Sequence, residues 1–420
     1  MINKVILDNG VCILTEEIPH VRSAAVGFWV DAGSRDEADS VSGVCHFIEH
    51  MLFKGTENRS AKDIAEALDR VGGQLNAFTT KEYTCYYARV LDEHLELAVD
   101  VLTDMLFHSR FAPEDVERER NVIVEEIKMY EDTPDELVHD VLAKALWNTH
   151  ALGRPVIGSA GVIQNLSRGD LLDYYDRHYR HGRYVIAVAG NVKHERVTEL
   201  LSRIFGDLPA GGPPRAVSAP DPNQRVECRE KDTEQVHLCI GSQGLRLDDE
   251  HIYVLQVLNT LLGGGMSSRL FQKVREQLGL AYNIYSYHSS YRDTGLFGIY
   301  AGLSRENVGT VLDIVLDEVN DLRNGGVSEE EMTRTKEQLK GSFLLSLESV
   351  NARMSRLGKS QLYLGRVQTP EEIVRELARV KTEQIAAVCD QIFRRDKLSL
   401  ASIGPWQEDG AWSAALSRLG

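Results

Sequence analysis

The stretch Tyr83–Val90, with the sequence YTCYYARV, predicts a strand, and residues 92–106 after it carry apolar side chains at helical spacing. The same order returns in the second half of the chain, where Gly295–Leu303 (GLFGIYAGL) precedes the helical pattern of residues 305–322. In both places an acidic helix start follows a short turn. Strand runs followed by long helices are typical of α+β layers. The repeat therefore predicts an α+β fold of two similar domains, each a mainly antiparallel sheet with helices packed on one face.

A proline-rich stretch near the midpoint separates the two halves. Residues 208–223 contain five of the eleven prolines of the 420-residue chain, a density that favours an extended connector over helix or strand. Each half then has about 200 residues, which is a plausible domain size. The prediction is an N-terminal domain at residues 1–210, a linker at 211–223 and a homologous C-terminal domain at 224–420.

The composition is that of an ordinary folded protein. Apolar residues make up 43% and charged residues 26% of the chain, and no apolar run approaches the roughly 20 residues that span a bilayer. The formal net charge of -16 argues against a nucleic-acid partner, since phosphate contacts need a basic surface. The first residues show neither a signal peptide nor a transit peptide. We therefore expect a cytoplasmic protein with neither nucleic acid nor membrane as partner, a mature organellar form being the alternative.

A short helix with two histidines carries the first sign of chemistry. The stretch Ser42–Thr56 (SGVCHFIEHMLFKGT) predicts a helix that begins after Ser42 and stops at a glycine. His46 and His50 are four residues apart, so both rings project from one face and could bind one zinc ion. Glu49 lies near the same face and could accept a proton from water. The alternative is two partly exposed histidines on an amphipathic helix, and a third ligand is needed to decide.

A second helical pattern, at residues 117–127, offers that third ligand. Glu119 and Glu126 share one face with two apolar residues. Burying such acids costs several kcal/mol unless a cation or hydrogen bonds compensate them. Zinc would compensate Glu126, and Glu119 could support a ligand from behind. The alternative is an ordinary charged face on which Glu125 and Glu126 are both solvated.

The run Gly43–Thr56 resembles the zinc motif of the pitrilysin/insulinase family, the inverzincins, and more narrowly that of mitochondrial processing peptidases and their bacterial relatives. Glu126 lies 76 residues after His50, which is the register of the family's third zinc ligand. Glu119, seven residues earlier, matches the family's supporting glutamate. The resemblance thus implies one zinc ion per chain, held by His46, His50 and Glu126.

The resemblance extends to a predicted strand, Gly72–Thr79 (GGQLNAFT), which is similar to the family's active-site edge strand. It implies that Asn76, Ala77 and Phe78 bind an extended peptide by strand addition. Without the resemblance, a glycine turn into an ordinary strand is an equally good interpretation.

In the second half, Val274–Tyr282 matches an arginine–tyrosine pair of the same family. The resemblance implies that Tyr282 contacts the developing oxyanion and that Arg275 orients the substrate or the tyrosine. A structural arginine and a core tyrosine are the alternative. The second half lacks a paired-histidine motif, so we expect an active N-terminal and an inactive C-terminal domain.

Together these features predict a zinc metalloendopeptidase that cleaves unfolded or extended peptides inside a chamber. We expect a homodimer, in which the second half of one subunit faces the zinc of the other. Glu49 is expected to act as general base and to return the proton to the leaving amine. The alternative is a non-catalytic subunit, either a structural core protein or a peptide-binding module.

Overall fold

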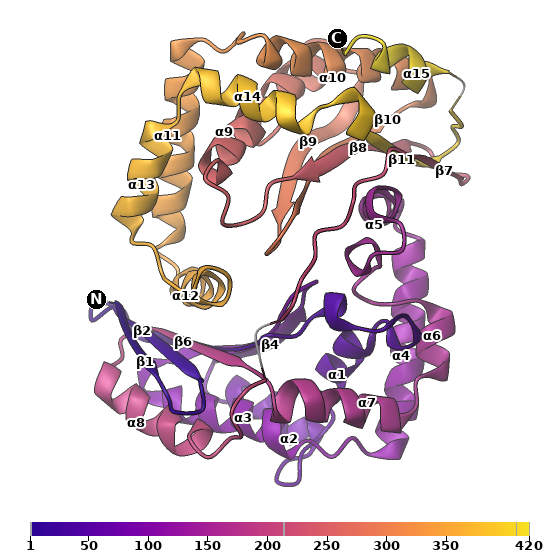
Figure 1. The fold of residues 1–420 in the computed structure, drawn as a ribbon. Helices are drawn as coiled ribbons and strands as arrows, with labels where there is room; N and C mark the ends of the chain where they lie inside the picture. Colours follow the sequence, from indigo (N-terminus) through magenta and orange to yellow (C-terminus); the bar gives the residue numbers. More distant parts are fainter. Residues whose placement is uncertain (1, 213–214, 409, 420) are drawn as a thin grey trace. The chain divides into compact units, whose positions relative to one another are not determined.

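A computed structural model describes residues 2–212, 215–408 and 410–419 (Figure 1). The chain forms two compact units, each assembled from three segments. Unit 1 comprises Met1–Lys128, Pro155–Arg215 and Leu345–Val367. Unit 2 comprises Met129–Arg154, Ala216–Leu344 and Gln368–Gly420.

Unit 1 contains a six-stranded sheet in the order β1-β2-β6-β3-β5-β4. Neighbouring strands are antiparallel except β2 and β6, which are parallel. The strands are β1 (Ile2–Ile6), β2 (Cys12–Glu17), β3 (Ser23–Val30), β4 (Gln74–Thr79), β5 (Thr84–Leu91) and β6 (Tyr184–Gly190). Its helices are α1 (Val44–Leu52), α2 (Ala61–Asp69), α3 (Leu95–His108), α4 (Pro113–Glu131), α6 (Ala160–Asn165), α7 (Arg168–Tyr175), α8 (His194–Phe205) and α12 (Val350–Leu364).

Unit 2 repeats this topology with five strands in the order β7-β11-β8-β10-β9. Here β7 and β11 are the parallel pair, and the other neighbours are antiparallel. The strands are β7 (Val226–Glu230), β8 (Val236–Gly244), β9 (Ala281–Ser290), β10 (Gly295–Leu303) and β11 (Ser399–Gly404). Its helices are α5 (Pro134–Trp147), α9 (Ile252–Leu262), the π-helical turn η6 (Phe271–Gln277), α10 (Val308–Arg323), α11 (Glu329–Ser346), α13 (Pro370–Arg379), α14 (Thr382–Ile392) and α15 (Ala411–Leu416). The α+β duplication expected from the sequence is therefore confirmed.

One helix in each unit comes from the other half of the sequence. α12 covers the second face of the unit 1 sheet, where Met354 and Leu357 pack with Trp29 of β3. α5 covers the corresponding face of the unit 2 sheet, where Leu142 packs with Tyr300 of β10. The predicted contiguous domains, 1–210 and 224–420, differ from the compact units in these two exchanged segments. Both sheets therefore carry helices on both faces, not on one as expected.

The predicted linker is held to unit 1 by Arg215, whose side chain is only 9% exposed. Its guanidinium pairs with Asp36 and donates to the backbone oxygen of Glu82 at 2.8 Å. Pro213 and Pro214, which belong to the same predicted linker, lie outside the described residues.

Glycines let the exchanged helix α12 lie close to the sheet of unit 1. Gly27 of β3 has the side chain of Met354 directly over it, so an added Cβ atom would have to displace that side chain. Gly358 of α12 sits against the indole of Trp29 in the same way. In unit 2, Gly241 of β8 meets Leu142 of α5. Both helix–sheet contacts thus depend on glycines that let the helix approach the sheet closely.

We expect Gly358→Ala to lower the free energy of unfolding by about 1–3 kcal/mol, because the new methyl group overlaps the rigid, buried Trp29 ring. Urea denaturation followed by circular dichroism measures the change. Gly161→Ala in α6 is the matched control, since its Cβ would meet nothing within 4 Å and alanine favours a helix. Equal stability of the Gly358→Ala variant and the wild type would contradict the close contact.

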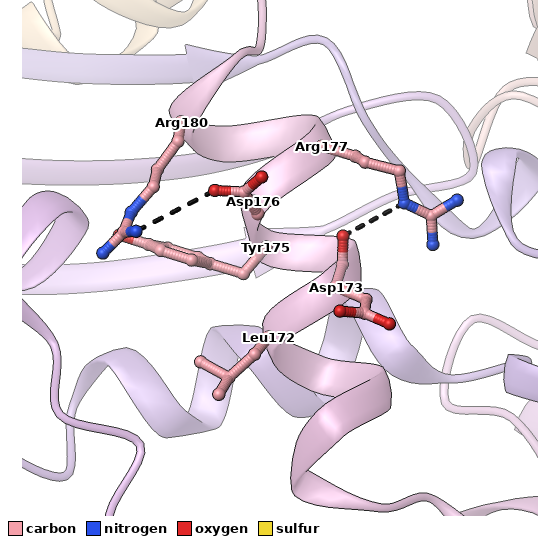
Figure 2. A pocket seen from close by; sticks show the side chains of 6 residues that line it. All are labelled: Leu172, Asp173, Tyr175, Asp176, Arg177 and Arg180. Carbon is pink, nitrogen blue, oxygen red and sulfur yellow. Dashed lines mark hydrogen bonds and ion pairs between the residues drawn. The ribbon is translucent and has the colours of Figure 1, made fainter.

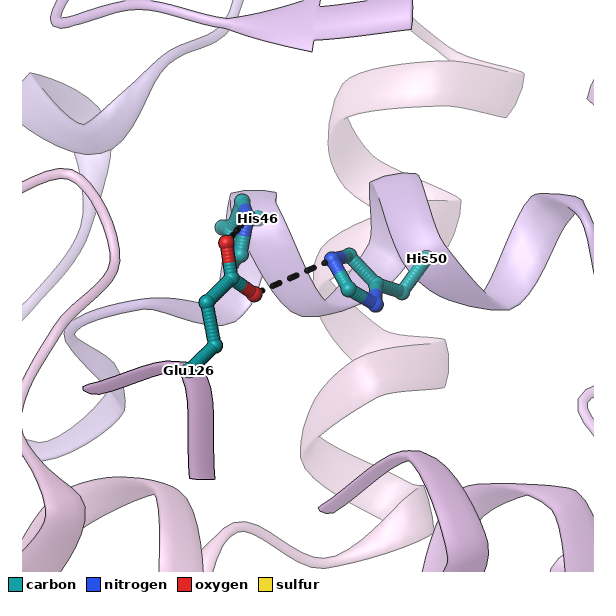
Figure 3. Close-up of side chains that lie close together, drawn as sticks. All are labelled: His46, His50 and Glu126. Atoms are coloured by element: carbon teal, nitrogen blue, oxygen red, sulfur yellow. Dashed lines mark ion pairs between the residues drawn. The ribbon is translucent and has the colours of Figure 1, made fainter. Parts of the chain in front are cut away.

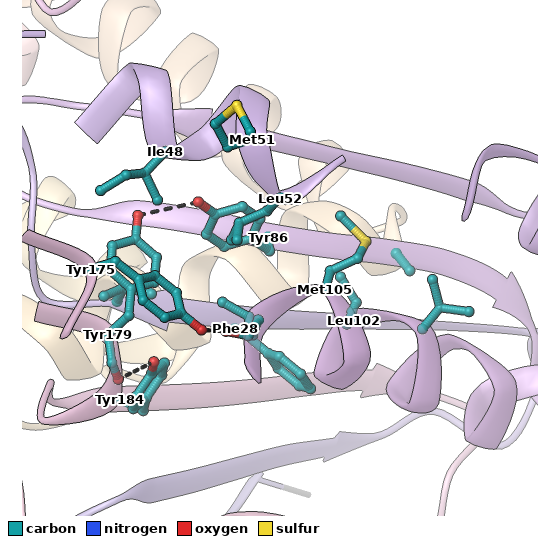
Figure 4. Packing of buried hydrophobic residues seen from close by; sticks show 14 of the residues in the cluster. Phe28, Ile48, Met51, Leu52, Tyr86, Leu102, Met105, Tyr175, Tyr179 and Tyr184 are labelled. Atoms are coloured by element: carbon teal, nitrogen blue, oxygen red, sulfur yellow. Dashed lines mark hydrogen bonds between the residues drawn. The ribbon is translucent and has the colours of Figure 1, made fainter. Parts of the chain in front are cut away.

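The helix α1 rests on the main core of unit 1. Its Ile48, Met51 and Leu52 are fully buried among aromatic side chains of the sheet and of neighbouring helices (Figure 4). The buried hydroxyls there are paired, with 3.1 Å between those of Tyr86 and Tyr179. This packing fixes which side of α1 faces the core and leaves His46 and His50 partly exposed on another side. No helix in the described part of the chain has both the length and the apolar character to cross a membrane.

Candidate metal centre

The start of α1 is capped by a buried acid. Gly43 is the N-cap residue, with a φ of 97° that favours glycine. The carboxylate of Glu37 accepts hydrogen bonds from the backbone N–H groups of Gly43 and Cys45, each at 2.8 Å. A negative charge at this position also suits the positive end of the helix. Ser42, which the sequence suggested as N-cap, lies one residue before it.

His46 and His50 lie side by side on α1, and Glu126 reaches them from α4 (Figure 3). The ring centroids of the two histidines are 4.6 Å apart. The Nε2 atoms of His46 and His50 are 3.9 Å and 3.6 Å from the carboxylate oxygens of Glu126. One ligand atom from each of the three residues lies within 4.8 Å of the others. The three side chains therefore converge on one point, and all three belong to unit 1.

This donor set fits zinc. Two imidazole nitrogens and one carboxylate oxygen are a common set of protein ligands at catalytic zinc sites, which keep a further position open. Burial lowers the pKa of His46 to about 3, so its ring is neutral near pH 7, as a metal ligand must be. Glu125, the neighbour of Glu126, points elsewhere: its side chain is 71% exposed and pairs with Lys128 at 2.7 Å.

Glu119 lies beside the ring nitrogen of His50 that faces away from Glu126. One carboxylate oxygen of Glu119 lies 3.2 Å from Nδ1 of His50, and the other lies 2.8 Å from Nζ of Lys54. Because an ionised carboxylate only accepts, Nδ1 of His50 carries the proton and Nε2 keeps its lone pair toward Glu126. Glu119 is itself only 3% exposed, and Lys54 supplies its counter-charge.

Glu49 lies next to the cluster and is held by Thr79. The Thr79 hydroxyl donates to Oε2 of Glu49 at 2.5 Å. Burial raises the pKa of Glu49, and hydrogen bonds from Thr79 oppose that rise. A half-buried carboxylate with a raised pKa has the character of a general base.

Asn76, Ala77 and Phe78 lie on β4, at one edge of the unit 1 sheet. Asn76 is exposed, and its side chain accepts the backbone N–H of Ala77 at 2.8 Å. The ring of Phe78 packs 6.1 Å from that of Trp29, on the side that α12 covers. Much of the Phe78 side chain is therefore engaged in the fold.

Arg275 and Tyr282 both lie in unit 2, where they contact each other. The guanidinium of Arg275 is 5.2 Å from the ring centroid of Tyr282 and 4.8 Å from that of Phe271. Tyr282 is 74% exposed, so the interpretation of this residue as a core tyrosine is wrong. An exposed tyrosine stacked by an arginine is available for contact with another molecule.

Sequence reasoning gave no role to three residues that support the site, namely Glu37, Lys54 and Thr79. Two of them had a usable signal. Lys54 follows His50 by four residues, which is the spacing of side chains on one face of a helix. Thr79 follows Ala77 by two residues in a strand, so these two side chains point to one face of the sheet. Glu37 had none, because a loop residue is brought to a helix start only by the fold.

A pocket elsewhere in unit 1 offers less chemistry than the metal centre. The pocket in Figure 2 lies along the end of α7 and the turn after it. Its arginines are engaged locally: Arg177 donates to the backbone oxygen of Asp173 at 3.0 Å, and Arg180 lies 3.8 Å from Asp176. The three converging ligands remain the better candidate for a functional site.

The chain is similar to known proteins over nearly its whole length. Residues 12–160 match the model for "Insulinase (Peptidase family M16)", and residues 165–339 match that for "Peptidase M16 inactive domain". It is 46% identical over 405 residues to the Bacillus subtilis (strain 168) protein called "Uncharacterized zinc protease YmxG", covering 96% of this chain and 98% of that protein. An uncharacterized zinc protease of Streptomyces coelicolor is 45% identical over 421 residues, covering 98% of this chain and 91% of its own.

Two crystal structures share the fold. A peptidase M16 inactive domain from Pseudomonas fluorescens superposes with a TM-score of 0.90 at 23% identity, over 97% of this chain and 98% of its own. A protease from Helicobacter pylori does so with a TM-score of 0.89 at 21% identity, over 96% of this chain and 99% of its own. The matches in sequence and the metal centre agree, and the chain belongs to the insulinase family of peptidases, M16.

Proposed function

We propose that this protein is a zinc-dependent endopeptidase that hydrolyses internal bonds of unfolded or extended peptides. The convergence of His46, His50 and Glu126 beside Glu49 is the observation that carries the proposal. Relatives named zinc proteases support it. The likeness of the motif to that of processing peptidases favours cleavage within a peptide over removal of end residues.

The proposed reaction divides the work among named side chains. His46, His50 and Glu126 would hold the metal, with Glu119 fixing the orientation of His50. Zinc in such a site supplies a Lewis acid that lowers the pKa of water and polarises a carbonyl group. Glu49 accepts the proton from the attacking water and then passes it to the leaving amine.

The peptide is proposed to bind as an added strand along the outer edge of β4. That edge has no partner strand in the described part of the unit 1 sheet. Strand addition needs an extended backbone, so it selects unfolded segments over folded domains. Asn76 and Ala77 would then lie beside the bound peptide.

We further propose a homodimer in which the second half of one subunit offers Tyr282 and Arg275 to the metal centre of the other. The exposure of Tyr282 and its contact with Arg275 support this role. Tyr282 would donate its hydroxyl hydrogen to the developing oxyanion. Light scattering that gives a monomer mass for the fully active enzyme would contradict the dimer.

The proposal also places the enzyme in the cytoplasm. All six cysteines are free thiols, and five of them are buried. Such cysteine usage suits a reducing compartment.

Metal removal tests the proposed function. The purified protein is expected to contain one zinc ion per chain by elemental analysis and to cut a peptide library at internal positions. A chelator should abolish cleavage, and added zinc should restore it, because the ligand set provides one metal site. Zinc present with every peptide left intact would overturn the peptidase proposal and favour a peptide-binding role.

A further inference from the structure

Thr79 makes a short hydrogen bond to Glu49. The distance of 2.5 Å from its hydroxyl to Oε2 is that of a charge-assisted bond between a hydroxyl and a carboxylate. Thr84, opposite Thr79 on β5, donates its own hydroxyl to the backbone oxygen of Ala32 at 3.0 Å. The Thr79 hydroxyl must be the donor toward Glu49, because an ionised carboxylate can only accept.

The backbone N–H of Thr79 also hydrogen-bonds the Glu49 carboxylate. Among residues 2–212, 215–408 and 410–419, Thr79 is the only side chain that hydrogen-bonds this carboxylate. Burial raises the pKa of Cys85 and Tyr86 on β5, and the nearby charge of Glu49 raises it further. A glutamate side chain has three rotatable bonds, so loss of the hydroxyl bond would leave the carboxylate less firmly held, with the backbone N–H of Thr79 as its remaining hydrogen-bond donor from that residue.

Thr79 is also the last residue of β4, the edge strand. Leu75 and Ala77 pack into the core on which α1 rests, and by strand alternation Thr79 points to the same side. Because β4 pairs with β5 through Thr79 itself, the sheet fixes the backbone that carries this hydroxyl. One strand therefore carries both the edge proposed to bind the peptide and the donor that holds the base.

We propose that Thr79 is a positioning residue that fixes Glu49 relative to the substrate-binding strand. This inference rests on the proposed peptidase function. A peptide added to β4 would align its backbone with that strand. The last residue of the same strand, Thr79, positions the Glu49 carboxylate. The proton acceptor and the scissile bond are thus both positioned by β4, and their fixed relative positions are the condition for efficient proton transfer.

Thr79→Val tests the role, since valine keeps the β-branched shape that suits a strand and removes the hydroxyl. We expect kcat to fall about 10- to 100-fold, the usual consequence of losing a hydrogen bond to a charged group. KM, zinc content and the urea midpoint should stay at wild-type values. Thr79→Ser, which keeps the hydroxyl, should recover most of the lost kcat.

A double-mutant cycle separates positioning of the base from a general structural effect. In a Glu49→Gln background, Thr79→Val should change neither the small residual rate nor the Kd of an uncut peptide measured by calorimetry. An additive loss of rate, or a weaker Kd, would overturn the inference in favour of a structural or substrate-contacting role. A wild-type enzyme that cleaves peptides, with Thr79→Val equally fast, would overturn this inference alone. A wild-type protein that binds zinc and cleaves no peptide would remove the proposed function instead.

Discussion

Glu49→Gln is expected to lower kcat for peptide cleavage about a thousandfold or more while leaving zinc in place. Proton transfer by a positioned base contributes about 100- to 10,000-fold to such reactions. The glutamine amide has the size of the carboxylate, and its oxygen can still accept the Thr79 hydroxyl. It cannot take a proton from water near pH 7. The metal ligands His46, His50 and Glu126 are unchanged, so the metal content should be unchanged.

Cleavage of a fluorogenic peptide measures kcat, and elemental analysis measures the zinc content. Glu125→Gln is the matched control, because it makes the same chemical change on an exposed residue paired with Lys128. It should retain wild-type activity and zinc. A Glu49→Gln enzyme with wild-type kcat would rule out Glu49 as the base. An inactive variant that has also lost zinc would mean that Glu49 supports the metal centre itself.

The repeated architecture could be predicted from the sequence, because strand and helix patterns are local. The stretch Tyr83–Val90 lies in β5 except for Tyr83, which precedes the strand, and its counterpart Gly295–Leu303 forms β10. The two strands occupy the same place in their sheets, each next to an edge strand. The exchange of α5 and α12 could not be predicted this way. An apolar helix face such as that of Leu142 in α5 fits any apolar sheet, and only the tertiary fold decides which sheet it covers.

The three candidate metal ligands could be predicted from their spacing in the sequence. The contacts of Glu37 and Thr79 with α1 and its side chains could not, because they depend on the tertiary fold. His46 and His50 are on one helix, so helix geometry alone puts their rings together. The preference for Glu126 over Glu125 came from helix periodicity and matches the positions of the two side chains. Glu37 and Thr79 reach α1 from a loop and a strand, and only the tertiary fold brings those two elements to the helix.

Glu126→Gln is expected to weaken zinc binding about 100-fold or more. The substitution removes the only charged group among the three converging side chains and leaves a neutral amide oxygen, which is a poorer zinc ligand. Loss of a residue that merely supports a ligand already costs about 10- to 100-fold in metal affinity, so loss of a ligand should cost at least the upper value. Peptide cleavage should fall with the metal and recover in part when zinc is added in excess. Competition with a chromophoric chelator measures the affinity directly.

A graded series makes this prediction sharper. Glu119→Gln keeps an oxygen that can accept the N–H of His50 but loses the charge that pairs with Lys54, so its zinc affinity should lie between those of the wild type and Glu126→Gln. Glu125→Gln should bind zinc as the wild type does, since its side chain points into solvent. Zinc loss in Glu125→Gln with normal binding in Glu126→Gln would reverse the assignment of the third ligand. Equal affinity in all three variants would mean that the metal is held by other groups, because the observed geometry makes the three glutamates unequal.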